Sequence, residues 1–333
     1  MKKLALIIVI ALSVAACEKV LFKKDLAGTN PYDNFNYLWH EVDKKYSYFE
    51  LKNIDWDAVK VKYEARLKSN MSEEALFKVL ADMLNELRDD HTNLVSPFNI
   101  SRYNVSLRGK SNYRQRTIEE FYIPNYRITG PFVHDYIRNN EIGYIRYSSF
   151  MNNIDAASLD YVLSRYKFTK GLILDLRENG GGNIFNVPIL LERFSTQRKL
   201  AAYSITRNGP GRNDFGKKEP FYINKHSGII YTKPVMVLID KGSYSATTFF
   251  ALLTKVYPNL VLVGDTTGGG GGLPNGGQLP NGWTYRFSVS QLLDLSGNNY
   301  AEAGVPADIE ATFDWTDLTK DEILEKAIEE LSK

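Results

Sequence analysis

Apolar residues recur at helical spacing in the first part of the chain. Between positions 35 and 46 they fall at i, i+3, i+4, i+7 and i+11, which is one face of a helix. Similar stripes run from position 56 to 67 and from 76 to 87, with Asp55 and Ser72 in front of them as N-caps. The pattern predicts three amphipathic helices that pack as a small bundle and end at Asp89-Asp90-His91-Thr92.

Beyond position 141, short apolar runs alternate with helical stripes. Strands are predicted over 142–147, 171–176, 235–239 and 260–263, and helices over 156–166, 183–194 and 245–256. The run at 171–176 is almost wholly apolar, as in a strand that is buried on both faces. Thr319 and Glu322 form a predicted capping box for the last helix. This alternation predicts an α/β domain.

The first seventeen residues follow the pattern of an export signal. Lys2 and Lys3 precede an apolar run, Leu4 to Val14, that is too short at ~1.5 Å per residue to cross a ~30 Å hydrocarbon core. Small residues then lead to Cys17, as in a bacterial lipobox, where the cysteine is acylated. We expect an exported lipoprotein, anchored by Cys17 on the periplasmic or cell-surface side of a bacterial envelope. An ordinary signal peptide with an incidental cysteine is the alternative.

These patterns divide the chain into segments. They are a signal peptide over 1–17, a tether over 18–30, a helical domain over 31–92, a linker with short strands over 93–140 and the α/β domain over 141–333.

The composition of the chain limits the kinds of partner and bound group that we expect. The chain has 41 Lys and Arg against 39 Asp and Glu, a net charge of +2, so no nucleic-acid partner is expected. With four His and one Cys, neither a zinc scaffold nor a disulfide framework is expected. The prediction therefore includes no metal and no cofactor.

Three segments place polar residues where chemistry could occur. Ser245 follows a buried strand at the start of a helix, where unpaired N–H groups favour a nucleophile, although a helix cap is the commoner role. The glycines at 180–182 let the backbone approach a ligand, as an oxyanion hole or simply a tight turn. His91 is a candidate general base or a surface histidine beside two acids.

Together these segments resemble the tail-specific, or C-terminal processing, serine peptidase family. The resemblance extends through Ser243-Tyr244-Ser245-Ala246, residues 263–268 and Gly304-Val305-Pro306-Ala307-Asp308. It implies a crotonase-like spiral α/β fold after the helical bundle, Ser245 as the nucleophile, and Gly181 and Ala246 as the oxyanion hole.

The catalytic lysine of the bacterial processing branch is missing, because Gly270 stands in its place. Lys255 is ten residues along the helix from Ser245, roughly 15 Å, and Lys241 lies before the turn with no clear aim at that serine. The chain is instead similar to the tricorn-core branch. That resemblance implies His91 as the base and Glu302 as the residue that orients it.

The implied function is a serine endopeptidase that hydrolyses exported proteins or peptides. Residues 268–277 are read as a mobile groove wall or a long turn, and 207–220 as a lid or a solvated charged loop. An inactive, membrane-tethered peptide-binding lipoprotein on the same scaffold is the alternative. A thioester enzyme of the crotonase-like fold is less favoured, since the Ser-x-Ser-Ala turn has no role in it.

Overall fold

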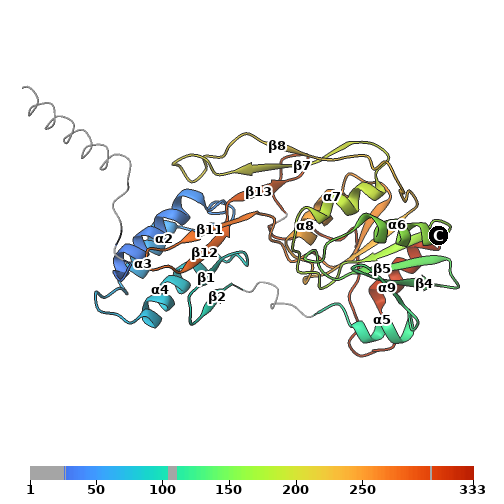
Figure 1. Ribbon diagram of the computed structural model, residues 1–333, viewed down its shortest axis with the longest axis horizontal. Coiled ribbons are helices and arrows are strands. Elements are labelled where there is room, and N and C mark those ends of the chain that lie inside the picture. The colour runs from blue at the N-terminus through green and yellow to red at the C-terminus, as the bar shows by residue number, and fades with distance from the viewer. Residues whose placement is uncertain (1–25, 27, 104–110, 301) are drawn as a thin grey trace, which may run out of the picture.

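A seven-stranded sheet forms the centre of the C-terminal part of the molecule (Figure 1). Its strand order is β14-β10-β9-β6-β5-β4-β3. Neighbours from β14 to β5 are parallel, and β4 and β3 continue the sheet as antiparallel strands. The bounds are β3 Arg127–Thr129, β4 Phe132–Ile137, β5 Ile142–Tyr147, β6 Gly171–Asp175, β9 Val235–Ile239, β10 Leu260–Gly264 and β14 Ile309–Glu310.

The computed structural model describes residues 26, 28–103, 111–300 and 302–333. The predicted signal peptide, the predicted acylation site Cys17 and most of the predicted tether lie outside these residues. Within them, none of the helices combines the length and apolar character that crossing a membrane requires.

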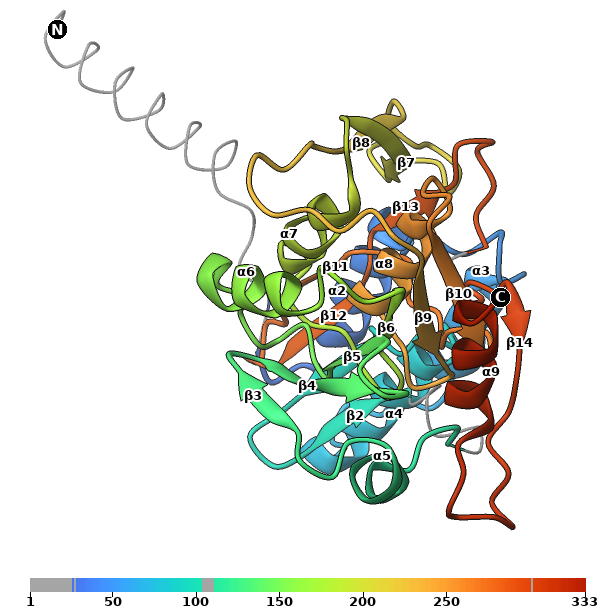
Figure 2. The same ribbon diagram turned by 90° about the vertical axis from the view of Figure 1, so that its right-hand side faces the viewer.

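Helices cover both faces of the large sheet because its central strands are apolar on both sides. Leu172 and Leu174 of β6 pack with one set of helices, whereas Ile173 between them packs with the other. Figure 2 shows α5 and α9 across the sheet from α6 and α7. The first set is α6 Ala156–Arg165, α7 Asn186–Leu191 and α8 Ala246–Thr254, and the second is α5 Gln115–Phe121 and α9 Glu322–Leu331. The predicted α/β fold with N-terminal helices is confirmed.

The N-terminal helices pack on a second, four-stranded sheet with the order β11-β12-β1-β2. The helices are α2 Pro31–Lys45, α3 Trp56–Glu64 and α4 Glu73–Asn85, and Asp55 and Ser72 cap α3 and α4 as predicted. The strands are β1 Asn93–Val95, β2 Ile100–Arg102, β11 Pro274–Gln278 and β12 Thr284–Ser288. The predicted bundle is therefore completed by a hairpin that comes from late in the sequence (Figure 1).

The predicted capping box of the last helix is wrong. The N-cap of α9 is Asp321, whose side chain accepts the Leu324 N–H at 2.9 Å, while the hydroxyl of Thr319 donates to Asp317 instead. Of the segment read as a groove wall or a long turn, residues 274–277 belong to strand β11, which pairs with β12.

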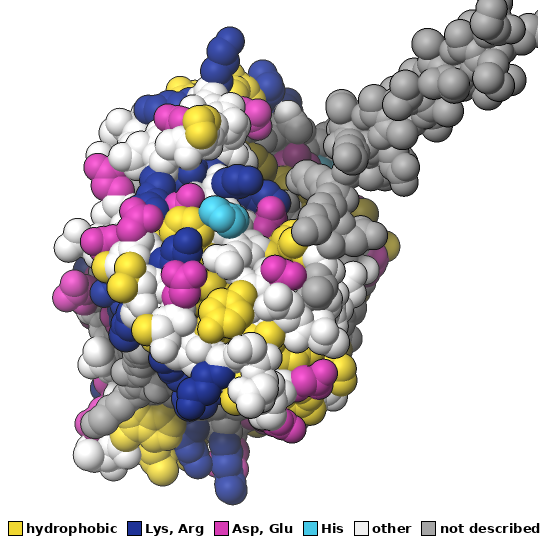
Figure 3. Space-filling view, turned by 90° about the vertical axis from the view of Figure 1, so that its left-hand side faces the viewer, with side chains coloured by type: hydrophobic (Ala, Val, Ile, Leu, Met, Phe, Trp, Pro, Cys, Tyr) yellow, Lys and Arg dark blue, Asp and Glu magenta, His cyan; other side chains and the backbone are white. Residues whose placement is uncertain are grey.

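A third sheet, β13-β7-β8, packs through β7 on the helix that follows β9 (Figure 1). Its strands are β7 Lys199–Thr206, β8 Glu219–Ile223 and β13 Ser290–Leu293. The loop after β7 contacts the N-terminal helices, since Arg207 donates to the carbonyls of Tyr46 and Asp43, and Arg212 pairs with Asp43 and Asp57. The end of the molecule formed by these helices displays interspersed basic and acidic side chains (Figure 3).

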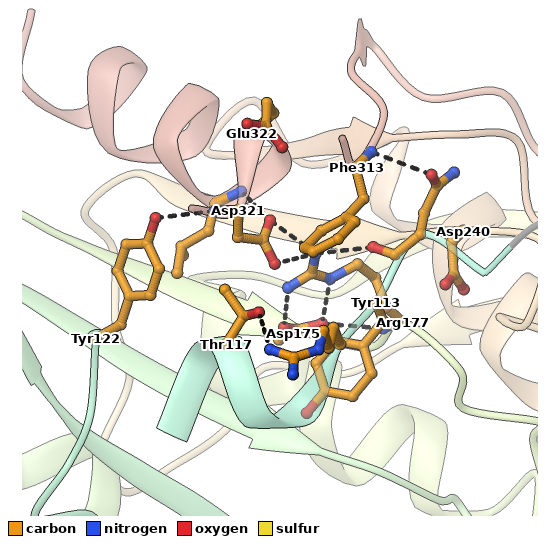
Figure 4. Close-up of polar contacts among 12 residues, drawn as sticks. Tyr113, Thr117, Tyr122, Asp175, Arg177, Asp240, Phe313, Asp321 and Glu322 are labelled. Carbon is orange, nitrogen blue, oxygen red and sulfur yellow. Dashed lines mark hydrogen bonds and ion pairs between the residues drawn. The ribbon is translucent and has the colours of Figure 1, made fainter. Parts of the chain in front are cut away.

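A buried charge cluster ties β6 to α9 (Figure 4). The Arg177 guanidinium is fully buried and contacts Asp175 at 2.6 Å and Asp321 at 2.8 Å. It also donates to the carbonyl of Asn112 at 3.1 Å. Arg177 therefore fixes the backbone where β6 ends and the glycine segment begins.

Replacing Arg177 by Met is expected to lower the free energy of unfolding by about 3–5 kcal/mol, because two buried carboxylates lose their partner. Denaturation by urea measures the loss. The matched control is Arg116→Met, which breaks the exposed Arg116–Glu120 pair and should cost less than about 1 kcal/mol. Equal stability of the two variants would show that the buried cluster does not hold these elements together.

Candidate active site

Ser245 lies in a strained turn between β9 and α8. Its φ of 56° is in the left-handed region, which is unfavourable for a residue with a side chain. The turn is held because the Ser245 N–H donates to the Gly269 carbonyl at 3.0 Å and the Ser245 carbonyl accepts from Phe249. The side chain makes no capping hydrogen bond to the helix, so the alternative role as a helix cap is not what the structure shows.

His91 reaches this serine from the other part of the molecule. Its Nε2 lies 2.9 Å from Ser245 Oγ. The segment that carries it is fixed by a hydrogen bond from the His91 N–H to Asp89 Oδ1 at 2.8 Å. The imidazole is largely buried and packs against the Tyr244 ring, with the ring centroids 5.2 Å apart. The geometry lets Ser245 donate its hydroxyl hydrogen to Nε2, provided that Nδ1 carries the ring proton.

The charge state of His91 suits a base. Burial lowers the pKa of its imidazole below the usual value, the Asp89 carboxylate acts in the opposite direction, and Arg286 and Lys52 add to the lowering. The ring is therefore neutral near pH 7 and able to accept a proton. The other ring nitrogen, Nδ1, lies 3.5 Å from the Ser288 hydroxyl, which is its hydrogen-bond partner among the described residues.

Glu302 lies near this site, but in the part of the chain that the structure describes no hydrogen bond or ion pair joins it to the imidazole. Its carboxylate pairs with Lys52 at 2.5 Å and accepts the Gly271 N–H at 3.2 Å. Burial and the nearby Asp89 raise the pKa of Glu302 to about 7, against the opposing effect of Lys52. Among the described residues, the Glu302 carboxylate thus pairs with Lys52, whereas the family resemblance implies a role in orienting His91.

Asp89 supports the histidine segment, a role that the sequence-based prediction did not include. It is fully buried, and its Oδ2 has no hydrogen-bond partner among the described residues. Sequence analysis treated it only as one of two acids beside a histidine. The spacing of Asp89 and His91 could have indicated this role, because an aspartate side chain often accepts the backbone N–H of the residue two positions later.

The predicted oxyanion donors have different surroundings. Ala246 is the first residue of α8, where the backbone N–H has no intrahelical acceptor. Gly181 lies directly behind the serine, and a Cβ added to it would be 2.9 Å from Ser245 Cβ. Its N–H, however, donates to Asn179 Oδ1 at 3.0 Å. The structure brings Gly181 to the expected place with its donor already engaged.

Asn179 connects the glycine segment to the serine turn. Its Nδ2 donates to the Tyr147 carbonyl at 2.8 Å, and its own carbonyl accepts the Tyr244 N–H at 3.0 Å and the Thr247 hydroxyl at 2.8 Å. Because it is fully buried with these partners, Asn179 fixes the distance between the two loops.

A groove of about 740 Å³ passes over Ser245 between the two parts of the molecule. The α/β part contributes apolar side chains, among them Ile184, Phe221, Phe249 and Leu292, and the four-stranded sheet contributes Arg102 and Arg286. The glycines from 270 to 272 form part of its wall. Lys255 and Lys241 are engaged elsewhere, with Asp308 and Asp265 respectively.

Comparisons with known proteins show what the chain is similar to. The family model described as peptidase family S41 matches residues 141–311, and the tricorn protease C1 domain matches residues 29–85. Carboxy-terminal processing protease CtpA of Bacillus subtilis (strain 168) is 28% identical over 180 residues, which are 54% of this chain and 37% of the relative. CtpB of the same strain is 29% identical over 171 residues, or 51% of this chain and 34% of the relative. The matched region thus spans about a third of each of these relatives.

Solved structures extend the similarity over nearly the whole chain. The crystal structure of a protein from Parabacteroides merdae ATCC 43184 matches this chain with 36% sequence identity and a TM-score of 0.87. The match covers 91% of this chain and 97% of that one. Mature CPAF is 14% identical, with a TM-score of 0.67 and coverage of 91% and 96%. At that identity the likeness to CPAF concerns the fold alone.

Substituting Gly181 by Ala is expected to slow the reaction of Ser245 with a fluorophosphonate by roughly 100-fold or more, on the scale of losing one oxyanion donor. The new Cβ would lie 2.6 Å from the Tyr244 carbonyl oxygen and 2.8 Å from the Ala246 nitrogen, at a φ of +88°. Gly180→Ala is the control, since a Cβ there meets nothing within 4 Å. Similar labelling rates in the two variants would remove Gly181 from the site.

Proposed function

The chain belongs to peptidase family S41, and from this membership we propose that it is a serine endopeptidase that cleaves exported proteins or peptides. The observation that carries the proposal is the 2.9 Å contact between His91 Nε2 and Ser245 Oγ at the groove. A nucleophile and a base within hydrogen-bond reach are what acyl transfer requires.

The proposed reaction uses these groups in order. Ser245 Oγ attacks the peptide carbonyl carbon while His91 Nε2 takes the hydroxyl proton. His91 then gives this proton to the leaving amine, and the acyl group stays on the serine. A water molecule attacks the ester with His91 again as the base, which releases the acid and restores the serine.

The charges that develop are met by groups of this chain. The oxyanion would be held by the Ala246 N–H and by the Gly181 N–H, once the substrate oxygen replaces Asn179 Oδ1 as its acceptor. The imidazolium would be stabilised by the Asp89 carboxylate, which favours the charged form of His91. In this scheme Glu302 acts on the histidine indirectly.

The groove indicates what it binds. Phe221 and Phe249 meet edge to face with ring centroids 4.9 Å apart, and Phe249 lies in the first turn of the helix that Ser245 precedes. We therefore propose that an apolar side chain near the scissile bond enters this part of the groove. Burial of such a side chain contributes about 1.5–3 kcal/mol to binding.

Digestion of a peptide library by the chain from residue 18 onward tests the activity. Cleavage sites should be enriched in apolar residues, and Ser245→Ala and His91→Ala should each lower the rate by at least ~10³-fold. The wild-type rate should fall as the pH drops through the pKa of His91, which lies below its usual value, because the protonated ring cannot accept a proton.

A fluorophosphonate should label the wild type and not Ser245→Ala. Cleavage that survives in Ser245→Ala would refute the mechanism. Peptide binding without cleavage or labelling would identify an inactive peptide-binding protein instead.

The same proposal places the protein on a membrane through a lipid at Cys17. The basic start, the apolar run and the small residues before this cysteine support it. In cells fed radiolabelled palmitate, the full chain should incorporate the label, whereas Cys17→Ala should not. When the two are partitioned between detergent and water, the wild type should enter the detergent phase and Cys17→Ala the aqueous phase. The control, Ser245→Ala, should be labelled like the wild type. Equal labelling of Cys17→Ala would refute the anchor.

A further inference from the structure

Lys52 connects the segment that carries His91 with the domain that carries Ser245, and we propose that it is a positioning residue that holds the base against the nucleophile. This inference rests on the proposed function of these two residues. It adds a residue outside the motifs of the resemblance, in the loop between α2 and α3.

On one side, Lys52 grips the histidine segment. Its Nζ donates to the Arg88 carbonyl at 2.8 Å, and the Arg88 guanidinium donates back to the Lys52 carbonyl. Arg88 has a φ of 50°, so this reciprocal pair also holds a strained turn three residues before the histidine. The position of His91 therefore depends on a loop that lies 36 residues before Arg88 in the chain.

On the other side, Lys52 reaches the serine through the glycine loop. Its Nζ pairs with Glu302 at 2.5 Å, and the same carboxylate accepts the Gly271 N–H at 3.2 Å. Two residues earlier, the Gly269 carbonyl accepts the Ser245 N–H at 3.0 Å. A continuous chain of polar contacts thus runs from the histidine segment to the backbone of the nucleophile.

The pair is shielded from solvent, with 14% of the Lys52 side chain and 7% of the Glu302 side chain exposed. A buried ion pair contributes little net stability, because removing two charges from water offsets their attraction. What it does supply is a fixed geometry, since neither charge can leave its partner without a large cost. A site assembled from two parts of the chain requires such a fixed contact.

Lys52 also acts on the base electrically. The charged groups that act on the His91 imidazole are Asp89 of its own segment, Arg286 of β12 and Lys52, and the Tyr244 ring packs against it. As a cation, Lys52 disfavours a second positive charge on the ring and so helps to keep it neutral. Removing this cation should raise the pKa of His91.

Kinetics of Lys52→Met test the positioning role. We expect kcat to fall roughly 10- to 100-fold, the scale of a small misplacement of reacting groups, while KM changes less than about 3-fold. Lys52→Arg keeps the cation and should recover most of the rate. Lys62→Met is the matched control, because it breaks an exposed Lys–Glu pair with Glu86 and should behave as wild type.

A double-mutant cycle shows whether Lys52 and Glu302 act as one link. If they do, Lys52→Met combined with Glu302→Gln should be no slower than Lys52→Met alone. Independent, additive losses would mean that the two side chains serve separate purposes and would overturn the link.

A titration of His91 by NMR provides a readout that needs no activity. The chain has four histidines, so assignment by the His91→Ala variant is direct. The pKa of His91 should rise in Lys52→Met and stay near the wild-type value in Lys52→Arg and Lys62→Met. A merely structural role for Lys52 would not produce this ordering.

The outcomes separate the two proposals. A wild type that neither cleaves peptides nor reacts with a fluorophosphonate refutes the proposed function, and with it the positioning role. If the wild type is active, and Lys52→Met has the same rate and the same His91 pKa as Lys62→Met, the positioning role of Lys52 is refuted. The proposed peptidase function is then unaffected.

Discussion

The hydrogen bond between His91 and Ser245 joins two parts of the chain that have separate hydrophobic cores. The histidine follows a helix of the N-terminal core, and the serine follows strand β9 of the large sheet. A contact of 2.9 Å tolerates little relative movement, so every element between the two cores serves to keep them in register. The Arg207 and Arg212 contacts are part of this frame.

The turn that carries Ser245 is strained and closely packed. Ser245 has an unfavourable backbone conformation, and it remains there because Gly269 and Phe249 hold its peptide groups. Gly181 approaches so closely that a side chain would collide with the turn. Buried Arg177 and Asn179 hold the start of the glycine segment that contains Gly181, through their hydrogen bonds to Asp321 and Tyr147. The site is thus largely formed before any ligand arrives.

Periodicity predicted the elements whose apolar pattern is local. The three N-terminal helices, β5, β9 and α6 lie close to their expected positions because each buries a continuous face. Short strands were expected between positions 93 and 140, but strands such as β1 and β2 could not be located individually, since three residues carry no period. The Ser245–His91 pair could be anticipated only through the resemblance. The contact of Lys52 with Glu302 could not, because nothing local links residues 250 positions apart.

The hairpin of β11 and β12 has a consequence for how the protein is made. Asn93, two residues after the histidine, lies opposite Arg286 in the sheet, so β1 can pair with β2 early but cannot pair with β12 until the ribosome has passed codon 288. Until then the three N-terminal helices lack the apolar side chains that β12 contributes to their core. At about 5–20 residues per second this interval lasts roughly ten seconds or more. The order of synthesis therefore delays the completion of this sheet, and of the hydrophobic core beneath it, until the polypeptide is nearly finished.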